Sequence, residues 1–280
     1  MGRRHFLAGG CVAAVAVAAV SAAVWAAPAH FVDNGPNAVP VDLELVLAVD
    51  VSYSMDPDEQ ALQREGYVKA LSSKEFLQAL RQGPNGKIAV TYIEWSSQYD
   101  QKIVMPWRVI ADPESADAVA SELANAPYQR RSRTSISGGL SFAKGLFDNS
   151  GFRGLRRVID VSGDGANNSG APVTQVRDEV VASGIVINGL PLMLKRANPG
   201  TMDIQNLDVY YEDCVIGGPG AFVIPVRDRA QFVEATREKL VLEVAGRAPR
   251  LVPVSDKQPR ISCLIGEQMW QDRWGGYDLK

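Results

Sequence analysis

Three oxygen-bearing side chains alternate along one short segment of the chain: Asp50, Ser52 and Ser54. Residues at every second position of an extended segment project to the same side, so one carboxylate and two hydroxyls are presented together. These groups are hard oxygen donors, which suit Mg²⁺, Mn²⁺ or Ca²⁺ and suit zinc poorly. The spacing therefore predicts a site for a divalent cation.

Two other positions offer further donors, because three side-chain oxygens do not complete an octahedral shell. Thr134 lies just before a segment of helical pattern, and Asp164 follows a short buried strand. All of these residues also have purely structural explanations, since Ser, Thr and Asp cap helices and Asp-Gly pairs form turns. Taken together, the positions favour metal binding over that explanation.

Residues that support catalysis are scarce in the body of the chain. The two histidines, His5 and His30, both lie near the N-terminus, so a Ser-His-Asp triad or a His-ligated metal is excluded from the rest. Ser52 has no neighbouring base to activate it as a nucleophile. We therefore expect a protein that is not an enzyme. The alternatives are a metal-assisted hydrolase and a structural subunit whose cation only stabilises a loop.

The elements that position these residues alternate between strand and helix patterns. Leu43–Val49 is almost wholly apolar, as in a strand buried on both faces, and Pro106 places a later strand at an edge. The alternation predicts a mostly parallel sheet, where ligands bind beyond the carboxyl ends of the strands. We expect strands at 43–49, 88–95, 102–109, 158–161, 185–192 and 221–226, and helices at 58–71, 74–80, 113–126, 137–147, 173–182 and 228–245.

The pattern Asp-x-Ser-x-Ser after the first buried strand resembles the metal-ion-dependent adhesion site (MIDAS) of von Willebrand factor A (vWA) domains. That family adds a Thr before a helix and an Asp-Gly pair after a later strand, which Thr134 and Asp164 match. Gly163 stands where Thr or Ser is common, and Arg133 stands where glycine is common. The resemblance covers roughly residues 41–246. It implies a Rossmann-like α/β domain: a mostly parallel central sheet, helices on both faces and one antiparallel edge strand.

The resemblance also implies roles for the site residues. Ser52, Ser54 and Thr134 would bind Mg²⁺, or Mn²⁺ or Ca²⁺, directly or through water. Asp50 and Asp164 would mostly hold coordinating waters. An open coordination position would then accept a Glu or Asp carboxylate from a partner protein, which is chemistry that Mg²⁺ favours. The implied function is a metal-dependent protein-binding module in adhesion or assembly.

Charge limits the choice of partners. The 280 residues hold 29 Lys and Arg against 32 Asp and Glu, a net charge of −3, so we expect no nucleic-acid partner. We interpret Asp56, Asp58 and Glu59 as acids in the first turn of a helix, where the helix dipole favours them. The basic cluster at 130–133 either surrounds the site and favours acidic partners, or is a solvated loop.

The N-terminal segment 1–29 has the pattern of a cleavable export signal, with arginines, a charge-free apolar stretch and a small-residue cleavage site after Ala26 or Ala29. Its RRHFL sequence resembles a twin-arginine signal, and an ordinary secretory signal is the alternative. We expect a bacterial protein in the periplasm or secreted, with no membrane span after cleavage. A linker follows at 30–40. The segment 210–222, together with the export signal, resembles a bacterial family, domain of unknown function 1194.

Two cysteines lie beyond the expected signal, Cys214 and Cys263. In an oxidising compartment an isolated pair is most simply a disulfide, and two buried thiols are the alternative. A disulfide would fasten the C-terminal tail, 247–280, to the body of the domain.

Overall fold

The computed structural model describes residues 35–194, 203–246 and 259–274. The expected export signal lies outside the described residues, as do the first part of the expected linker and parts of the tail. Within the described residues, no helix is both long enough and apolar enough to cross a membrane.

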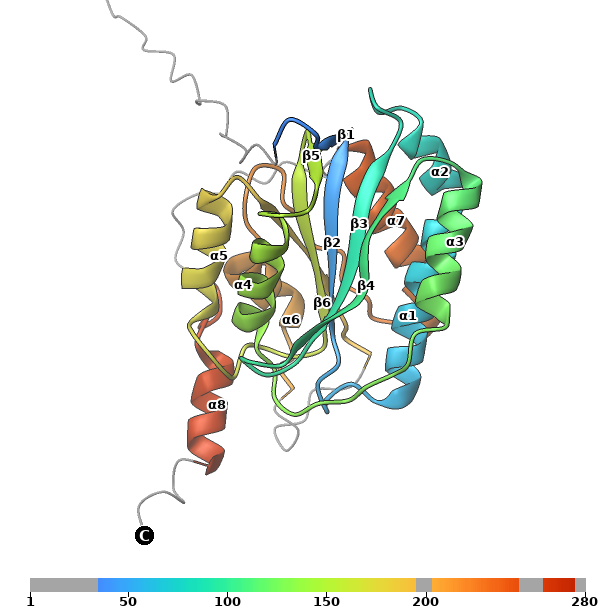
Figure 1. Ribbon diagram of the computed structural model, residues 1–280. Helices are drawn as coiled ribbons and strands as arrows, with labels where there is room; N and C mark the ends of the chain where they lie inside the picture. The colour runs from blue at the N-terminus through green and yellow to red at the C-terminus, as the bar shows by residue number, and fades with distance from the viewer. Residues whose placement is uncertain (1–34, 195–202, 247–258, 275–280) are drawn as a thin grey trace, which may run out of the picture.

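A five-stranded sheet forms the centre of the molecule (Figure 1). Four neighbouring strands are parallel, and the edge strand β4 runs antiparallel to β3. This arrangement confirms the expected α/β fold class, including the single antiparallel edge strand. The order across the sheet is β4 (Gln101–Ile110), β3 (Ile88–Trp95), β2 (Leu43–Asp50), β6 (Arg157–Gly163) and β7 (Val186–Pro191).

Helices cover both faces of the sheet because its central strand is apolar on both sides. Leu45 and Leu47 of β2 pack into one core, while Val46 and Ala48 pack into the other. The first core lies under α1 (Pro57–Leu71), α2 (Lys74–Leu80), α3 (Pro113–Ala124) and α7 (Phe232–Ala245). The second lies under α4 (Ile136–Leu146), α5 (Val173–Ala182), α6 (Leu207–Tyr210) and the π-helical turn Tyr211–Val215.

The expected strand at 221–226 is wrong. Isolated bridges pair Val223 with Gly189 and Val226 with Leu192, so the segment runs beside β7 without forming a continuous strand. The expected helix at 228–245 begins as a short 3₁₀ turn, Arg229–Gln231, before α7. Five elements were not anticipated: the paired strands β1 (Val39–Val41) and β5 (Phe152–Gly154), the helix α6, the π-helical turn Tyr211–Val215 and the C-terminal helix α8 (Ile265–Trp274).

Three ionisable side chains are buried together between α7 and β6. Lys239 Nζ lies 2.6 Å from Asp160 Oδ1 and 2.5 Å from Glu243 Oε1. Asn188 donates a further hydrogen bond of 3.0 Å to Glu243. Burial, with the nearby charge of Glu243, raises the pKa of Asp160 to about 7 despite the lysine. We call Lys239, Asp160 and Glu243 the buried triad.

Candidate metal centre

Three loops meet at the carboxyl end of the sheet and carry the candidate ligands. Strands β2 and β6 are parallel neighbours, with Val49 opposite Ser162, so the segments that follow them leave the sheet side by side. The loop before α4 joins them because the Arg131 N–H donates to the Val51 carbonyl at 2.9 Å. Asp50 and Asp164 come from the two strand ends, and Thr134 comes from the third loop.

A chain of hydrogen bonds connects four of the five candidates. The Ser52 N–H donates to Asp50 Oδ1 at 2.7 Å, and the hydroxyls of Ser52 and Ser54 are 2.7 Å apart. The Ser54 hydroxyl donates to Asp164 Oδ1 at 2.6 Å. These contacts tie the end of β2 to the end of β6 through side-chain oxygens.

Thr134 completes the group from the opposite loop. A Cβ at Gly165 would lie 3.6 Å from Thr134 Oγ1, which places this hydroxyl beside the loop that holds Asp164. Asn168 holds the Thr134 loop against the loop that follows Asp164. Its N–H donates to the Thr134 carbonyl at 2.8 Å, and its side-chain oxygen accepts the Thr134 N–H at 3.0 Å. The structure thus brings together all five residues that the sequence singled out.

The electrostatics of the group suit a cation. Asp50 is fully buried, and no hydrogen-bond donor within the described residues reaches its Oδ2. Burial and then the negative charge of Asp164 raise the pKa of Asp50 well above its usual range. A divalent cation would offset both effects. The described residues contain no group of three or more His, Cys, Asp or Glu side chains that could hold a metal ion. Three of the five candidate donors here are the hydroxyls of Ser52, Ser54 and Thr134.

The two departures from the vWA pattern have different physical explanations. A Cβ at Gly163 would lie 2.8 Å from Asp50 Oδ2, so β6 passes the carboxylate too closely for any side chain. Arg133 has φ +70°, the left-handed conformation that glycine adopts most easily. It keeps this conformation while its guanidinium stacks 4.0 Å from the Trp270 ring.

Tyr211 is a neighbour of the site that sequence reasoning missed. Its hydroxyl lies 3.1 Å from the position that a Gly163 Cβ would take, on the same side as the Asp50 carboxylate. Burial and the charge of Asp50 raise the pKa of this buried phenol well above its usual value. The only signal in the sequence was its place in the segment 210–222.

The charged residues around the site have separate roles. Asp56 caps α1 and forms a reciprocal capping box with Glu59, with bonds of 2.8 and 2.9 Å, as expected for acids in a first turn. Arg130 of the basic cluster donates to the Tyr53 carbonyl at 2.7 Å, and Arg131 lies 3.5 Å from Asp100. Residues 130–133 are thus exposed, and the cluster contacts the loop between Ser52 and Ser54 through the Arg130 side chain.

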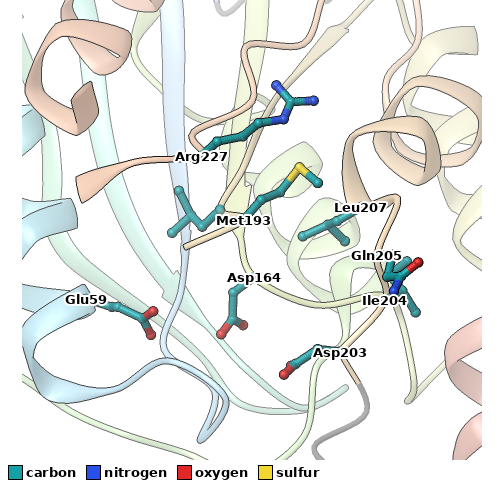
Figure 2. A pocket seen from close by; sticks show the side chains of 9 residues that line it. Glu59, Asp164, Met193, Asp203, Ile204, Gln205, Leu207 and Arg227 are labelled. Atoms are coloured by element: carbon teal, nitrogen blue, oxygen red, sulfur yellow. The ribbon is translucent and has the colours of Figure 1, made fainter. Parts of the chain in front are cut away.

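A hollow of about 200 Å³ opens beside Asp164. Figure 2 shows the carboxylates of Glu59, Asp164 and Asp203 on one side of it and the longer side chains of Met193 and Arg227 on the other. The side of the site toward this hollow is therefore acidic, whereas the side at Arg130 is basic.

Comparison with known proteins assigns the family. The sequence profile described as "Protein of unknown function (DUF1194)" matches residues 40–248, most of the chain. The chain belongs to the DUF1194 family. No curated protein sequence matches this DUF1194 protein.

Solved structures show that this chain has the vWA-type α/β fold. Proximal thread matrix protein 1 from the mussel byssus superposes with a TM-score of 0.51 at 15% identity, covering 74% of this chain and 49% of that one. A second structure of the mussel protein, with a zinc-occupied MIDAS motif, gives 0.51 at 16% identity with the same coverage. The pilus adhesin SpaC from Lactobacillus rhamnosus GG, in its open conformation, gives 0.50 at 15%, covering 73% and 30%. The chain spans about half the length of the mussel protein.

Proposed function

We propose that this DUF1194 protein is an exported, non-enzymatic module that binds a partner protein through a divalent cation. The observation that carries the proposal is the fully buried Asp50, whose second carboxylate oxygen has no donor among the described residues. A carboxylate in this state is costly unless a positive charge compensates it. The hydroxyls of Ser52 and Ser54, hydrogen-bonded next to it, are further donors of the type that Mg²⁺ accepts.

Five residues would hold the cation, which we propose to be Mg²⁺, with Mn²⁺ and Ca²⁺ as the other candidates. Ser52, Ser54 and Thr134 would bind it directly or through water, and Asp50 and Asp164 would hold coordinating waters. A bound cation of this kind supplies a coordination position for an external oxygen. The MIDAS of the mussel structure is occupied by zinc, which supports a divalent site but leaves the choice of ion to experiment.

The partner would offer a Glu or Asp carboxylate. Tyr53 lies between the two serines and is 62% exposed, and the Arg130 side chain is 5.4 Å from its ring. An acidic side chain that approaches from this direction meets a positive charge and an aromatic surface next to the cation. The acidic hollow beside Asp164 disfavours approach from the other direction.

Export is part of the proposal and rests on two features. The Cys214–Cys263 disulfide is present in the structure, and such bonds persist mainly in oxidising compartments. The N-terminal segment 1–29 has the composition of an export signal. We therefore propose that the protein works in the periplasm or outside the cell.

Calorimetric titration tests the cation site. Mg²⁺, Mn²⁺ and Ca²⁺ are titrated separately into metal-free protein without residues 1–29, into Asp50→Ala, and into Asp58→Ala. Asp58 is a suitable control because it is an acid of the same α1 region whose side chain is 86% exposed. We expect the wild type and Asp58→Ala to bind and Asp50→Ala to lose binding while keeping its circular dichroism spectrum. Absence of binding at millimolar cation, or binding that survives in Asp50→Ala, overturns the proposal.

Partner binding is tested with envelope proteins of the source cell, compared in Mg²⁺ and in EDTA. We expect a protein retained by the wild type in Mg²⁺ and lost both in EDTA and with Asp50→Ala. Replacing one Glu or Asp of that partner by its amide must then abolish retention. Retention that is equal in Mg²⁺ and EDTA refutes a metal-dependent contact.

A further inference from the structure

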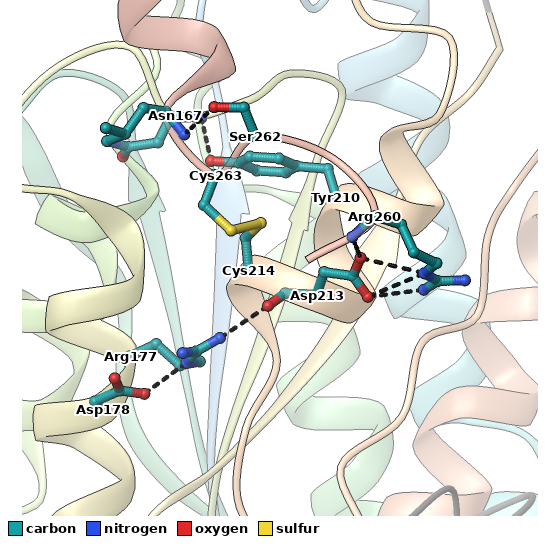
Figure 3. The surroundings of a disulfide bond; sticks show 10 residues. Asn167, Arg177, Asp178, Tyr210, Asp213, Cys214, Arg260, Ser262 and Cys263 are labelled. Carbon is teal, nitrogen blue, oxygen red and sulfur yellow. Dashed lines mark hydrogen bonds and ion pairs between the residues drawn. A yellow bond between two sulfur atoms is a disulfide. The ribbon is translucent and has the colours of Figure 1, made fainter. Parts of the chain in front are cut away.

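The C-terminal helix α8 lies at the end of the molecule where β2 and β6 reach their carboxyl ends (Figure 1). Its start is fixed at two points. Cys263 forms the disulfide with Cys214, and Arg260 donates to Asp213 through both its backbone N–H, at 2.6 Å, and its guanidinium, at 2.8 Å (Figure 3). These bonds hold the helix on the body of the domain.

The first turn of α8 contacts the loop that follows Asp164. A Cβ at Gly266 would lie only 2.1 Å from the Asn167 carbonyl oxygen, so the helix backbone rests directly on this loop. Glu267 Oε1 accepts a 2.7 Å hydrogen bond from Asn167 Nδ2. Asn167 is fully buried, and its side-chain oxygen accepts the Ser137 N–H of α4 at 3.0 Å. One amide therefore joins α8, the Asp164 loop and α4.

The middle of α8 contacts the loop that carries Thr134. The Trp270 ring lies 4.0 Å from the Arg133 guanidinium, and Arg133 directly precedes Thr134. A non-glycine residue with positive φ persists only where its surroundings hold it. The stacking on Trp270 is such a restraint, because it acts on the side chain of the strained residue itself.

We propose that α8 is a brace that positions the Thr134 and Asp164 loops for the cation, with Glu267 and Trp270 as its positioning residues. The inference rests on the proposed function, because it concerns the same site. Asn168 transmits the effect, since it follows Asn167 and exchanges two hydrogen bonds with Thr134. The disulfide keeps α8 next to the loops, which raises the effective concentration of the contacting groups. Contacts that are individually modest can therefore stay formed.

The test combines cation affinity with amide exchange. Glu267→Leu removes the acceptor, Glu267→Gln keeps an oxygen acceptor, and Trp270→Ala removes the stacking. Gln271→Leu is the matched control, because it makes a similar change at an exposed position of α8. We expect Mn²⁺ and Mg²⁺ to bind about three- to tenfold more weakly to Glu267→Leu and Trp270→Ala. For Glu267→Gln and Gln271→Leu we expect a cation affinity within about twofold of the wild type. Loss of even a modest contact would weaken the affinity by more than this.

Hydrogen exchange on the metal-free proteins gives the second readout. The amides of Thr134 and Asn168 should exchange faster in Glu267→Leu and Trp270→Ala, while core amides of β2 keep their protection. Wild-type affinity in both variants, with unchanged exchange, overturns the brace and leaves the cation site standing. If the wild type binds no cation, the proposed function fails and the metal role of α8 fails with it. Faster exchange at Thr134 and Asn168 would still show that α8 restrains the loops.

Discussion

Replacing Lys239 by methionine removes the only positive charge of the buried triad. The two side chains have similar lengths, so the change leaves the packing of α7 largely intact. Asp160 and Glu243 then remain fully buried without the ammonium group that lies 2.6 and 2.5 Å from them. Breaking a buried ion pair by removing one partner typically costs about 3–5 kcal/mol of the free energy of unfolding.

Two features of the triad set where the loss falls in that range. Asn188 continues to donate to Glu243, and Asp160 can take up a proton because its pKa already lies at about 7. Both features reduce the cost of the uncompensated charges, so we expect the free energy of unfolding to fall by about 3 kcal/mol at pH 7. For a domain of this size the melting temperature should fall by about 6–12 °C, on the basis of about 2–4 °C per kcal/mol.

Urea unfolding at pH 7 measures the loss, with Lys74→Met as a control at an exposed lysine. The double variant Lys239→Met/Asp160→Asn should recover part of the stability, because it removes one of the two uncompensated charges. A loss of less than about 1 kcal/mol in Lys239→Met would refute the reasoning. Simple additivity in the double variant would show that the two groups do not interact as the structure describes.

Three further predictions concern other buried or cross-linked groups. Asp50→Asn removes a buried charge, so it should raise the free energy of unfolding of the metal-free protein by about 1–3 kcal/mol. It should also abolish the Mg²⁺-dependent rise in melting temperature. A metal-free variant that is less stable than the wild type would contradict this. The raised pKa of Asp160 means that the folded state holds a proton that the unfolded state releases, so its contribution is full below pH about 4 and is lost as the pH rises through about 7. Asp160→Asn should therefore lose less stability than the wild type between these values in urea titrations, and parallel curves would refute the assignment. Cys263→Ser opens a cross-link between residues 49 positions apart and should lower the free energy of unfolding by up to about 4 kcal/mol. A reducing agent should produce the same loss in the wild type and no loss in the variant. Equal unfolding midpoints for the variant and the oxidised wild type would contradict this.

The parts of the fold that the sequence predicted are those dominated by local pattern. The run 43–49 is apolar at nearly every position, and only a strand covered on both faces buries such a segment. Asp50, Ser52 and Ser54 follow it directly, so their common location required no knowledge of the rest of the chain. Thr134 and Asp164 could be added because each lies at the junction of a strand or loop with the next element.

The missed parts depend on contacts between distant segments. Helix α8 has weak amphipathic character and is held by Cys263 and by loops about a hundred or more residues earlier, so its own residues carry little signal. The expected strand at 221–226 has β-forming residues, but tertiary context leaves it with only isolated bridges. Tyr211 reaches the site through the packing of the π-helical turn under β7, which no spacing rule encodes.

The glycine at position 163 has a consequence for any attempt to transplant the site. Most hydroxyl-bearing positions of the site lie on loops that could be copied into another sheet as short peptides. The hydroxyl of Tyr211 is different, because it comes from the last third of the chain and occupies the space that glycine leaves beside Asp50. A graft limited to the loops would leave that space to solvent. The smallest portable unit therefore includes the segment 207–215 as well as the strand ends.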